Sequence, residues 1–179
     1  MDNWDEYFIN ICDAVAKNSK CLSRQIGAVI VSDKSIISTG FNGPPRGITH
    51  CGRLRYEFDS YLKQTFGDRF EEFTDDQLET TCPRKLLGYK SGGGLHICTA
   101  SHAERNAIVN AARVGIKING AKMYMNCPMP CSECLKEIIN AGIEEIVISD
   151  GEYYDDLSRF LIRESYSLKV RTYNENKKL

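Results

Sequence analysis

The sequence of 179 residues has no apolar run approaching the roughly 20 residues that a membrane-spanning helix requires. Its first residues, MDNWDEYF, are acidic and amphipathic, and no basic segment followed by an apolar stretch is present. This pattern does not predict a secretory signal peptide. We therefore expect a cytoplasmic protein that does not act at a membrane.

The sequence also lacks an excess of either charge, because 23 Lys and Arg residues stand against 24 Asp and Glu residues, for a net charge of −1. Proteins that bind nucleic-acid polymers usually carry a basic face, so we do not expect a polynucleotide substrate. Free nucleotides need only a few local cations and are compatible with this composition. The length predicts a single domain over residues 1–179.

Hydrophobic periodicity predicts strands that alternate with helices, most regularly after residue 101. Helices are expected at 3–18, 102–114, 131–141 and 155–165, and strands at 27–31, 36–41, 121–126, 143–149 and 168–173. Residues 52–95 are rich in charged and aromatic side chains, and we expect a partly helical insertion there. The prediction is an α/β protein with three layers, a five-stranded mixed sheet between helices.

Eight cysteines are numerous for a chain of this length. In a reducing compartment clustered cysteines bind metal more often than they form disulfides. Cys12 lies in an apolar helical stretch and Cys127 at a strand end, so we expect both to be structural. Two other cysteines, Cys131 and Cys134, form a PCxxC motif and are the leading metal ligands.

Cys131 and Cys134 are three residues apart at the start of an expected helix, so they lie on one face. The positive end of a helix also favours the thiolate that zinc requires. With His102 they supply three protein ligands, which leaves the fourth position of a zinc ion for water, as in catalytic sites. The alternative is a structural zinc site with Glu104 as a surface carboxylate.

Glu104 lies two residues beyond His102 and can face the water rather than the metal. Zinc lowers the pKa of a bound water towards about 7. A neighbouring carboxylate can take the proton of this water and deliver it to a ring nitrogen and then to a leaving amine. An HxE motif separated from PCxxC by one helix and one strand is the known signature of zinc-dependent deaminases.

These motifs resemble the cytidine deaminase superfamily, and more closely its deoxycytidylate (dCMP) deaminases, over most of residues 1–173. Further matching segments are Gly27–Val31, Gly40–Pro44, His102–Ile108 and Ile138–Ile143. The resemblance implies a cytidine-deaminase-like fold and hydrolysis of dCMP to dUMP and ammonia, which supplies the thymidylate precursor. It also implies a homo-oligomer, with a hexamer favoured, activated by dCTP and inhibited by dTTP.

For regulation, the resemblance makes the insertion part of an effector site, with Lys90 as a candidate contact and magnesium accompanying the triphosphate. For the substrate, it implies that Asn42 binds the sugar hydroxyl and that Tyr153 contacts the base or phosphate. The backbone near Ala103 and Cys131 would recognise the base edge. The alternative for Asn42 is that it only forms a turn. The alternative for Tyr153 is that it is an aromatic residue at the rim of the site, and that Tyr154 contacts the nucleotide instead.

A monophosphate needs cationic donors, because Arg can bind phosphate through two hydrogen bonds. The candidates are Arg24, Arg46, Lys90 and Arg105. Arg24 and Arg46 rank first, because they flank the strands that lead to Asn42.

Relatives of this kind can carry a second, structural zinc. The resemblance implies ligands near the first strand, in the loop after Asn42, in the segment before His102 and in the insertion. Here these are Cys21, Cys51, Cys82 and Cys98, with His96 as an alternative ligand. They do not form CxxC pairs, and unpaired buried thiols are the alternative.

Rival substrates within the same fold are free cytidine, guanine, tRNA adenosine and a riboflavin precursor. A hypothesis from another class is a non-catalytic zinc- or nucleotide-binding protein. The intact Glu104 argues against it, because a binding protein needs no group that transfers protons.

Overall fold

The computed structural model describes residues 4–149 and 151–173. The chain divides into two compact units, which are described separately. The first unit contains Met1–Ser19, Ile26–Asn42 and His102–Leu179, and the second contains Lys20–Gln25 and Gly43–Ser101. The expected insertion, 52–95, lies inside the second unit, which extends beyond it on both sides. The single-domain organisation stays a prediction.

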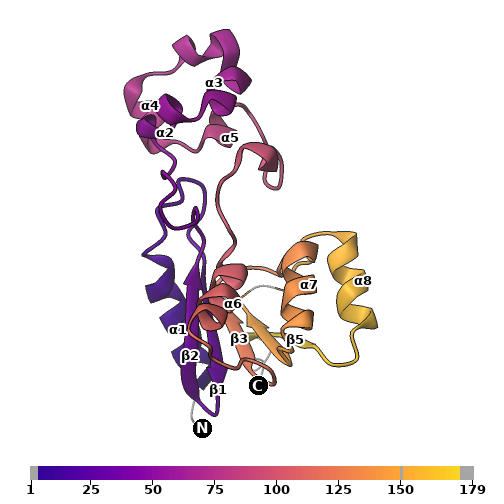
Figure 1. Cartoon of the computed structure of the whole chain (residues 1–179). Helices are drawn as coiled ribbons and strands as arrows, with labels where there is room; N and C mark the ends of the chain where they lie inside the picture. The colour runs from indigo at the N-terminus through magenta and orange to yellow at the C-terminus, as the bar shows by residue number, and fades with distance from the viewer. Residues whose placement is uncertain (1–3, 150, 174–179) are drawn as a thin grey trace. The chain divides into compact units, whose positions relative to one another are not determined.

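The first unit contains a five-stranded mixed sheet, which confirms the predicted α/β class (Figure 1). In the order β2-β1-β3-β4-β5, strand β1 is antiparallel to both neighbours, whereas β3, β4 and β5 are parallel. The strands are β1 (Gly27–Ser32), β2 (Ser35–Phe41), β3 (Lys122–Met125), β4 (Glu145–Ile148) and β5 (Lys169–Thr172). The turn between β1 and β2 places Asp33 and Lys34 at positive φ, as a tight hairpin turn requires.

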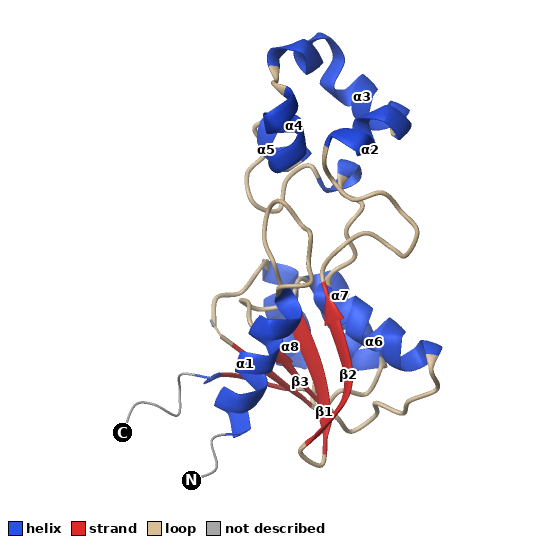
Figure 2. Cartoon of the chain, turned by 90° about the vertical axis from the view of Figure 1, so that its left-hand side faces the viewer, coloured by secondary structure: helices blue, strands red, loops and turns tan. Residues whose placement is uncertain are grey.

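Helices cover both faces of this sheet (Figures 1 and 2). They are α1 (Trp4–Ala16) on one face, and α6 (Ala103–Arg113), α7 (Ser132–Asn140) and α8 (Asp156–Glu164) on the other. Because successive strand residues point to opposite faces, Val29 and Val31 pack with α1, whereas Ala28 and Ile30 pack on the other side. The expected bounds differ from these by one or two residues, and Asn3 lies outside the described residues.

Two glycines allow helices to approach the sheet closely. A Cβ atom at Gly27 would lie 2.1 Å from the carbonyl oxygen of Cys12 in α1. A Cβ atom at Gly40 would lie 2.2 Å from the backbone nitrogen of Ala107 in α6. Hydrogen bonds then fasten α6 to β2: the Ser38 hydroxyl donates to the Ala107 carbonyl over 2.7 Å.

Arg171 in β5 joins α1 to the sheet. Its guanidinium donates two hydrogen bonds to Asp5 over 2.6 and 2.8 Å, and one to Glu145 over 2.5 Å. Tyr124 also donates to Asp5 over 3.0 Å. This network fixes the first helix to the parallel strands β3, β4 and β5.

The second unit consists of short helices around a small core of its own. They are α2 (Arg53–Phe58), α3 (Ser60–Phe66), η1 (Gly67–Glu72), α4 (Asp75–Thr80), α5 (Pro83–Leu86) and η2 (Leu95–Ile97). Its core residues are Tyr56, Leu62, Phe66, Leu78 and Ile97. Thr74 and Gln77 form a capping box that starts α4. Across both units, the described helices include none that is long and apolar enough to span a membrane.

Candidate metal centre and substrate site

His102 and Cys131 occupy equivalent positions at the starts of two helices. Each is the extended residue that precedes its helix, α6 for His102 and α7 for Cys131. Their carbonyl oxygens accept the first helical hydrogen bonds, each over 3.0 Å, from the amides of Asn106 and Leu135. The sequence placed both residues inside their helices, whereas the structure makes them the cap residues. Two positive helix ends therefore surround the site.

The predicted zinc ligands lie close together. The Nδ1 atom of His102 is 3.3 Å from Sγ of Cys134 and 3.5 Å from Sγ of Cys131. All three ligand atoms lie within 4.8 Å of one another. Over residues 4–149 and 151–173, no other group of three or more His, Cys, Asp or Glu residues meets this criterion. One imidazole nitrogen and two sulfurs form a donor set that fits zinc.

Hydrogen bonds among these three residues shift their pKa values. The pKa of Cys131 falls to about 4, because Cys134 donates a hydrogen bond to its sulfur and His102 adds another. The same contact and burial raise the pKa of Cys134. The hydrogen bond with Cys131 raises the pKa of His102. A lowered pKa favours the thiolate of Cys131, which is the form that binds zinc.

Glu104 is buried beside this cluster, with only 4% of its surface exposed. Burial raises the pKa of its carboxyl, while the charge of His102 opposes that shift. It is therefore not the surface carboxylate of the alternative interpretation. A buried carboxyl with a raised pKa, next to a set of metal ligands, is suited to accepting and returning a proton.

Asn42 follows β2 and is 7% exposed. Its side-chain oxygen accepts a hydrogen bond from the amide of Ile26 over 2.8 Å, and its carbonyl accepts one from the Ser19 hydroxyl over 2.7 Å. These bonds hold the end of the hairpin in place. Its role toward a sugar stays a prediction. Ala103, in the first turn of α6, is fully buried.

Tyr153 and Tyr154 are both 44% exposed, and the Arg159 guanidinium lies 5.1 Å from the ring centroid of Tyr153. Two contacts tie this loop to the metal-ligand segment. Asp155, which caps α8, accepts from the amides of Ser158 over 2.6 Å and of Ser132 over 3.5 Å. The Ser158 hydroxyl donates to the carbonyl of Pro130 over 3.3 Å.

This connection between the loop and the segment of Cys131 was not predicted from the sequence. The sequence signals only the helix start, because Asp is a preferred cap residue and Asp155 directly precedes α8.

In the second unit, four cysteines line one small cavity of about 30 Å³. They are Cys21, Cys51, Cys82 and Cys98, and His50, which the sequence analysis did not single out, lines it too. His96, the alternative ligand, is not among the lining residues, and its ring packs edge-on against Tyr61 and Tyr89. A cavity of this size accommodates one water molecule or ion.

The predicted phosphate donors lie in different parts of the chain. Arg24 and Arg46 belong to the second unit, and their phosphate contacts stay predictions. Lys90 is exposed, and Arg105 forms an ion pair with Glu137 over 2.9 Å.

Cys12 is buried and its thiol donates to the Tyr124 carbonyl, which confirms its structural role.

Comparison with known proteins identifies one family. Residues 2–150 match the family described as cytidine and deoxycytidylate deaminase zinc-binding region. The deoxycytidylate deaminase of Mycobacterium phage D29 is 33% identical over 150 residues, covering 81% of this chain and 93% of that protein. The deoxycytidylate deaminase of Saccharomyces cerevisiae is 30% identical over 172 residues, and covers 96% of this chain. The chain spans only 45% of the yeast protein's length.

A similar fold is found in the crystal structure of dCMP deaminase from the cyanophage S-TIM5, which was solved in complex with dCMP and dUMP. The TM-score is 0.62 at 22% sequence identity, over 96% of this chain and 98% of that chain. This similarity establishes the fold.

Proposed function

Because the chain belongs to the cytidine and deoxycytidylate deaminase family, as its motifs predicted, we propose that it hydrolyses dCMP to dUMP and ammonia. The observation that carries this proposal is the cluster of His102, Cys131 and Cys134 beside the buried Glu104. The curated relatives named as deoxycytidylate deaminases support this substrate. The dCMP and dUMP bound in the cyanophage enzyme support it further.

In this mechanism His102, Cys131 and Cys134 hold the metal. Zinc at this position would supply Lewis acidity that makes water nucleophilic near neutral pH. Glu104 moves two protons: its carboxylate takes one from the attacking water and gives it to the ring nitrogen. It then takes the second from the hydroxyl that the water has become on the ring carbon and gives it to the amino group, which leaves as ammonia while the carbonyl forms. Its burial suits both steps, because a raised pKa brings the carboxyl closer to the pH at which it works.

Other groups of the chain would hold the nucleotide. The backbone at Ala103 and Cys131 faces the base edge, Asn42 binds the sugar hydroxyl, and Tyr153 contacts the base or phosphate. Arg24 and Arg46 are the proposed phosphate donors, because a guanidinium binds phosphate through paired hydrogen bonds.

Ammonia release from dCMP, CMP, deoxycytidine and guanine tests this proposal, with Glu104→Ala as the inactive control. We expect turnover of dCMP well above the other three, and none in the Glu104→Ala protein. Selective turnover of another substrate refutes the proposed function. Turnover of dCMP that survives in Glu104→Ala refutes the mechanism.

The cysteines of the second unit are proposed to bind a second, structural zinc. Support comes from the single small cavity that Cys21, Cys51, Cys82 and Cys98 line together. A metal there would tie the segments of the second unit to one another and add to the stability of a small core. Zinc content tests this: about two zinc ions per chain support the proposal, and one per chain contradicts it.

Regulation by dCTP as activator and dTTP as inhibitor is proposed for the second unit, with magnesium accompanying the triphosphate. A larger cavity there, about 330 Å³, supports an effector site, because small-molecule pockets are of this size. Lys90 is not among its lining residues and stays a predicted contact. Sigmoidal dCMP kinetics that dCTP makes hyperbolic support the idea, and a rate insensitive to both nucleotides contradicts it.

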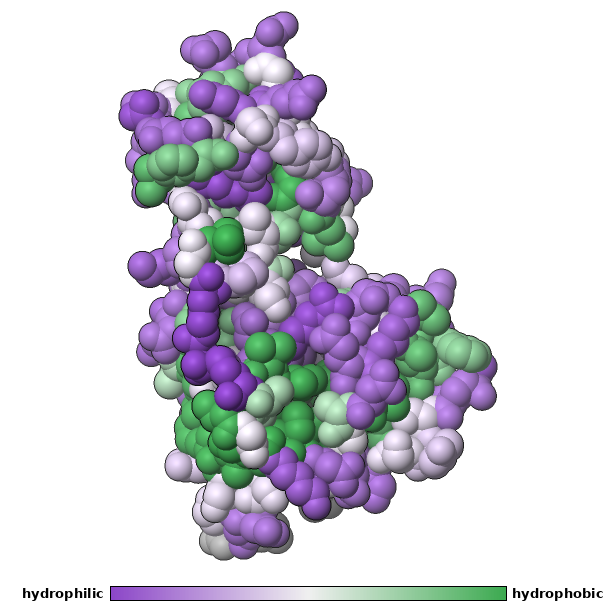
Figure 3. Space-filling view, in the orientation of Figure 1, coloured by the Kyte–Doolittle hydropathy of each residue, from purple (hydrophilic) through white to green (hydrophobic). Residues whose placement is uncertain are grey.

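A homo-oligomer, with a hexamer favoured, is proposed from the exposed apolar surface of the first unit. Figure 3 shows hydrophobic residues gathered over α6, and Val109, Val114 and Ile116 are 58%, 60% and 39% exposed. Contiguous apolar surface of this kind often marks a protein interface. Light scattering measures the mass, and a monomer at micromolar concentration contradicts the proposal. A cytoplasmic location stays a prediction.

A further inference from the structure

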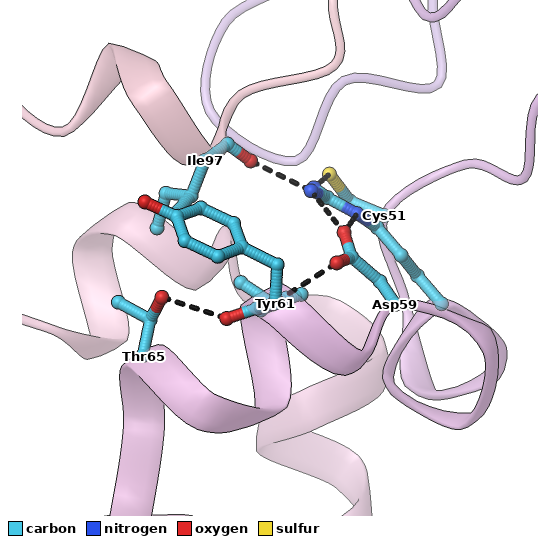
Figure 4. Close-up of polar contacts among 7 residues, drawn as sticks. Cys51, Asp59, Tyr61, Thr65 and Ile97 are labelled. Carbon is cyan, nitrogen blue, oxygen red and sulfur yellow. Dashed lines mark hydrogen bonds and ion pairs between the residues drawn. The ribbon is translucent and has the colours of Figure 1, made fainter.

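A buried arginine contacts Cys51, one of the cysteines that line the small cavity of the second unit. Arg55 lies in α2 and is only 4% exposed, although arginine is rarely buried unless its charge is paired. Its guanidinium donates to Asp59 from Nε over 3.1 Å and from Nη2 over 2.8 Å. Nη2 also donates to the carbonyl of Ile97 over 2.7 Å, and Nη1 to Sγ of Cys51 over 3.4 Å (Figure 4).

These four hydrogen bonds join three separate segments. Asp59 caps α3, where it also accepts the amide of Leu62 over 2.9 Å. Ile97 lies in η2, directly before Cys98. The planar guanidinium thus holds the sulfur of Cys51 and the backbone next to Cys98 in one arrangement. Both cysteines line the small cavity.

The contact with sulfur suits a metal-bound cysteine better than a free one. A neutral thiol is a weak acceptor, whereas a thiolate accepts a strong, charge-assisted hydrogen bond from a guanidinium. A zinc ion held by four thiolates also leaves an excess of negative charge, which a buried cation offsets. Groups in the outer shell of a metal site commonly act in this way, orienting ligands and tuning affinity.

We propose that Arg55 is a positioning residue of the second metal site, where its guanidinium fixes Cys51 and the segment of Cys98 and thereby strengthens metal binding. This inference rests on the proposed structural zinc and is independent of the proposed reaction. It assigns a function to the burial of Arg55, because the ion pair with Asp59 alone does not require the guanidinium to reach the Cys51 sulfur.

The test measures zinc release to a colorimetric chelator from wild-type, Arg55→Gln, Arg55→Lys and Arg53→Gln proteins. Arg53 is the matched control, since it lies in the same helix, is exposed, and forms its ion pair with the exposed Asp75. A Cys82→Ser protein identifies which of the two zinc ions belongs to the cavity. Cobalt replaces zinc in a parallel series, because the thiolate-to-cobalt absorption band responds to hydrogen bonding at sulfur.

We expect Arg55→Gln to weaken the second zinc by about 10–100-fold, the range for outer-shell partners of metal ligands. Arg55→Lys keeps the positive charge but loses the planar guanidinium with its paired donors, so it should weaken binding of the second zinc less than Arg55→Gln does. Arg53→Gln should leave the affinity unchanged. The cobalt band should shift in both Arg55 variants and not in Arg53→Gln.

Equal zinc affinity in wild-type and Arg55→Gln overturns the proposal, and so does an equal loss in Arg53→Gln. If Arg55→Gln does not fold, Arg55→Lys decides, because wild-type affinity and an unshifted cobalt band in that variant also overturn it. One zinc per wild-type chain removes the second site itself. The turnover of dCMP by the wild-type protein tests the proposed reaction separately.

Discussion

The Nδ1 atom of His102 lies 3.5 Å from Sγ of Cys131, although the two residues are 29 positions apart in the chain. Each is the cap residue of its own helix, and these helices pack on the same face of the sheet. The start of α6 lies beside the end of β2, where Asn106 donates to the Phe41 carbonyl, and α7 follows the end of β3. Because β2 and β3 are both antiparallel to β1, they run in the same direction, and both helix starts lie at the same end of the sheet. The candidate metal centre therefore depends on the shared direction of β2 and β3.

Replacing Glu104 by Gln should remove the group that transfers the proton while keeping its size. We expect kcat for dCMP to fall by about 10²–10⁴-fold, which is the usual contribution of general acid–base catalysis. Zinc content should not change, because Glu104 is not a ligand. Steady-state kinetics together with metal analysis check both statements, and a loss of zinc in this variant would contradict the separation of roles.

Removing the metal should abolish activity reversibly. Treatment with a strong chelator is expected to release the zinc and stop dCMP turnover, and added zinc should restore it. Cys131→Ser should bind this zinc weakly, because a hydroxyl is a poor substitute for the thiolate. Cys12→Ser is the matched control, since Cys12 is buried away from the ligand cluster. Full activity of the chelated protein would exclude a zinc mechanism.

Gly40→Ala should move α6 away from β2, because the new Cβ would lie 2.2 Å from the Ala107 nitrogen and 2.4 Å from the Ala103 carbonyl oxygen. We expect a loss of about 1–3 kcal/mol in the free energy of unfolding, as for other overpacked cores. Activity should also fall, because α6 carries Glu104. Gly43→Ala is the control, since no atom lies within 4 Å of its Cβ position. Urea denaturation that shows equal stability for both variants would contradict this account.

Arg171→Gln should weaken the attachment of α1 and change how stability depends on pH. Hydrogen bonds from Arg171 hold the pKa of Asp5 below its usual value. Burial acts to raise the pKa of Glu145, but hydrogen bonds from Lys122 and Arg171 outweigh it and lower the value. Carboxyls whose pKa is lowered by folding stabilise the protein above their unfolded-state pKa, and this contribution is lost as the pH falls.

We therefore expect wild-type stability to decline as the pH falls from about 5 towards 2, and the decline to be shallower in Arg171→Gln. At pH 7 the variant should lose about 1.5–3 kcal/mol, the usual value for hydrogen bonds to charged groups. Arg163→Gln is the control, because Arg163 is exposed and forms an ion pair with its exposed neighbour Glu164. Parallel pH curves for wild type and Arg171→Gln would contradict the assignment.

Asp155→Ala should loosen the loop that carries Tyr153. It removes the cap of α8 and the contact with the Ser132 amide, and loss of a cap costs about 0.5–2 kcal/mol. If Tyr153 contacts the nucleotide as proposed, KM for dCMP should rise by more than kcat falls. Asp156→Ala serves as the control, because Asp156 lies in the same helix and does not cap it. Unchanged kinetics in Asp155→Ala would separate the loop from substrate binding.

Much of the candidate site could be predicted from local sequence. The HxE and PCxxC motifs predict the three candidate zinc ligands and Glu104, because their spacing relative to a helix start already restricts what they can bind. The alternating pattern from residue 121 onward likewise predicts strands and helices within one or two residues of those observed. Both signals depend on contacts between residues that are near one another in the chain.

Contacts between distant segments could not be predicted in this way. The sequence shows Cys21, Cys51, Cys82 and Cys98 as isolated cysteines, and the family resemblance alone grouped them. Arg55 has no signal at all, because an arginine in a short charged helix is usually exposed. The family resemblance offered His96 as an alternative ligand, yet its ring packs against two tyrosines, whereas His50 lines the cavity.

By itself, then, the sequence determined the metal chemistry and the alternation of strands and helices, since these follow from residue type and short-range spacing. The tertiary structure decided which side chains share a buried environment. It buried Glu104 and so raised the pKa of its carboxyl, and it turned the Arg55 guanidinium toward Cys51. Burial and charge pairing depend on how the whole chain packs, which local spacing does not specify.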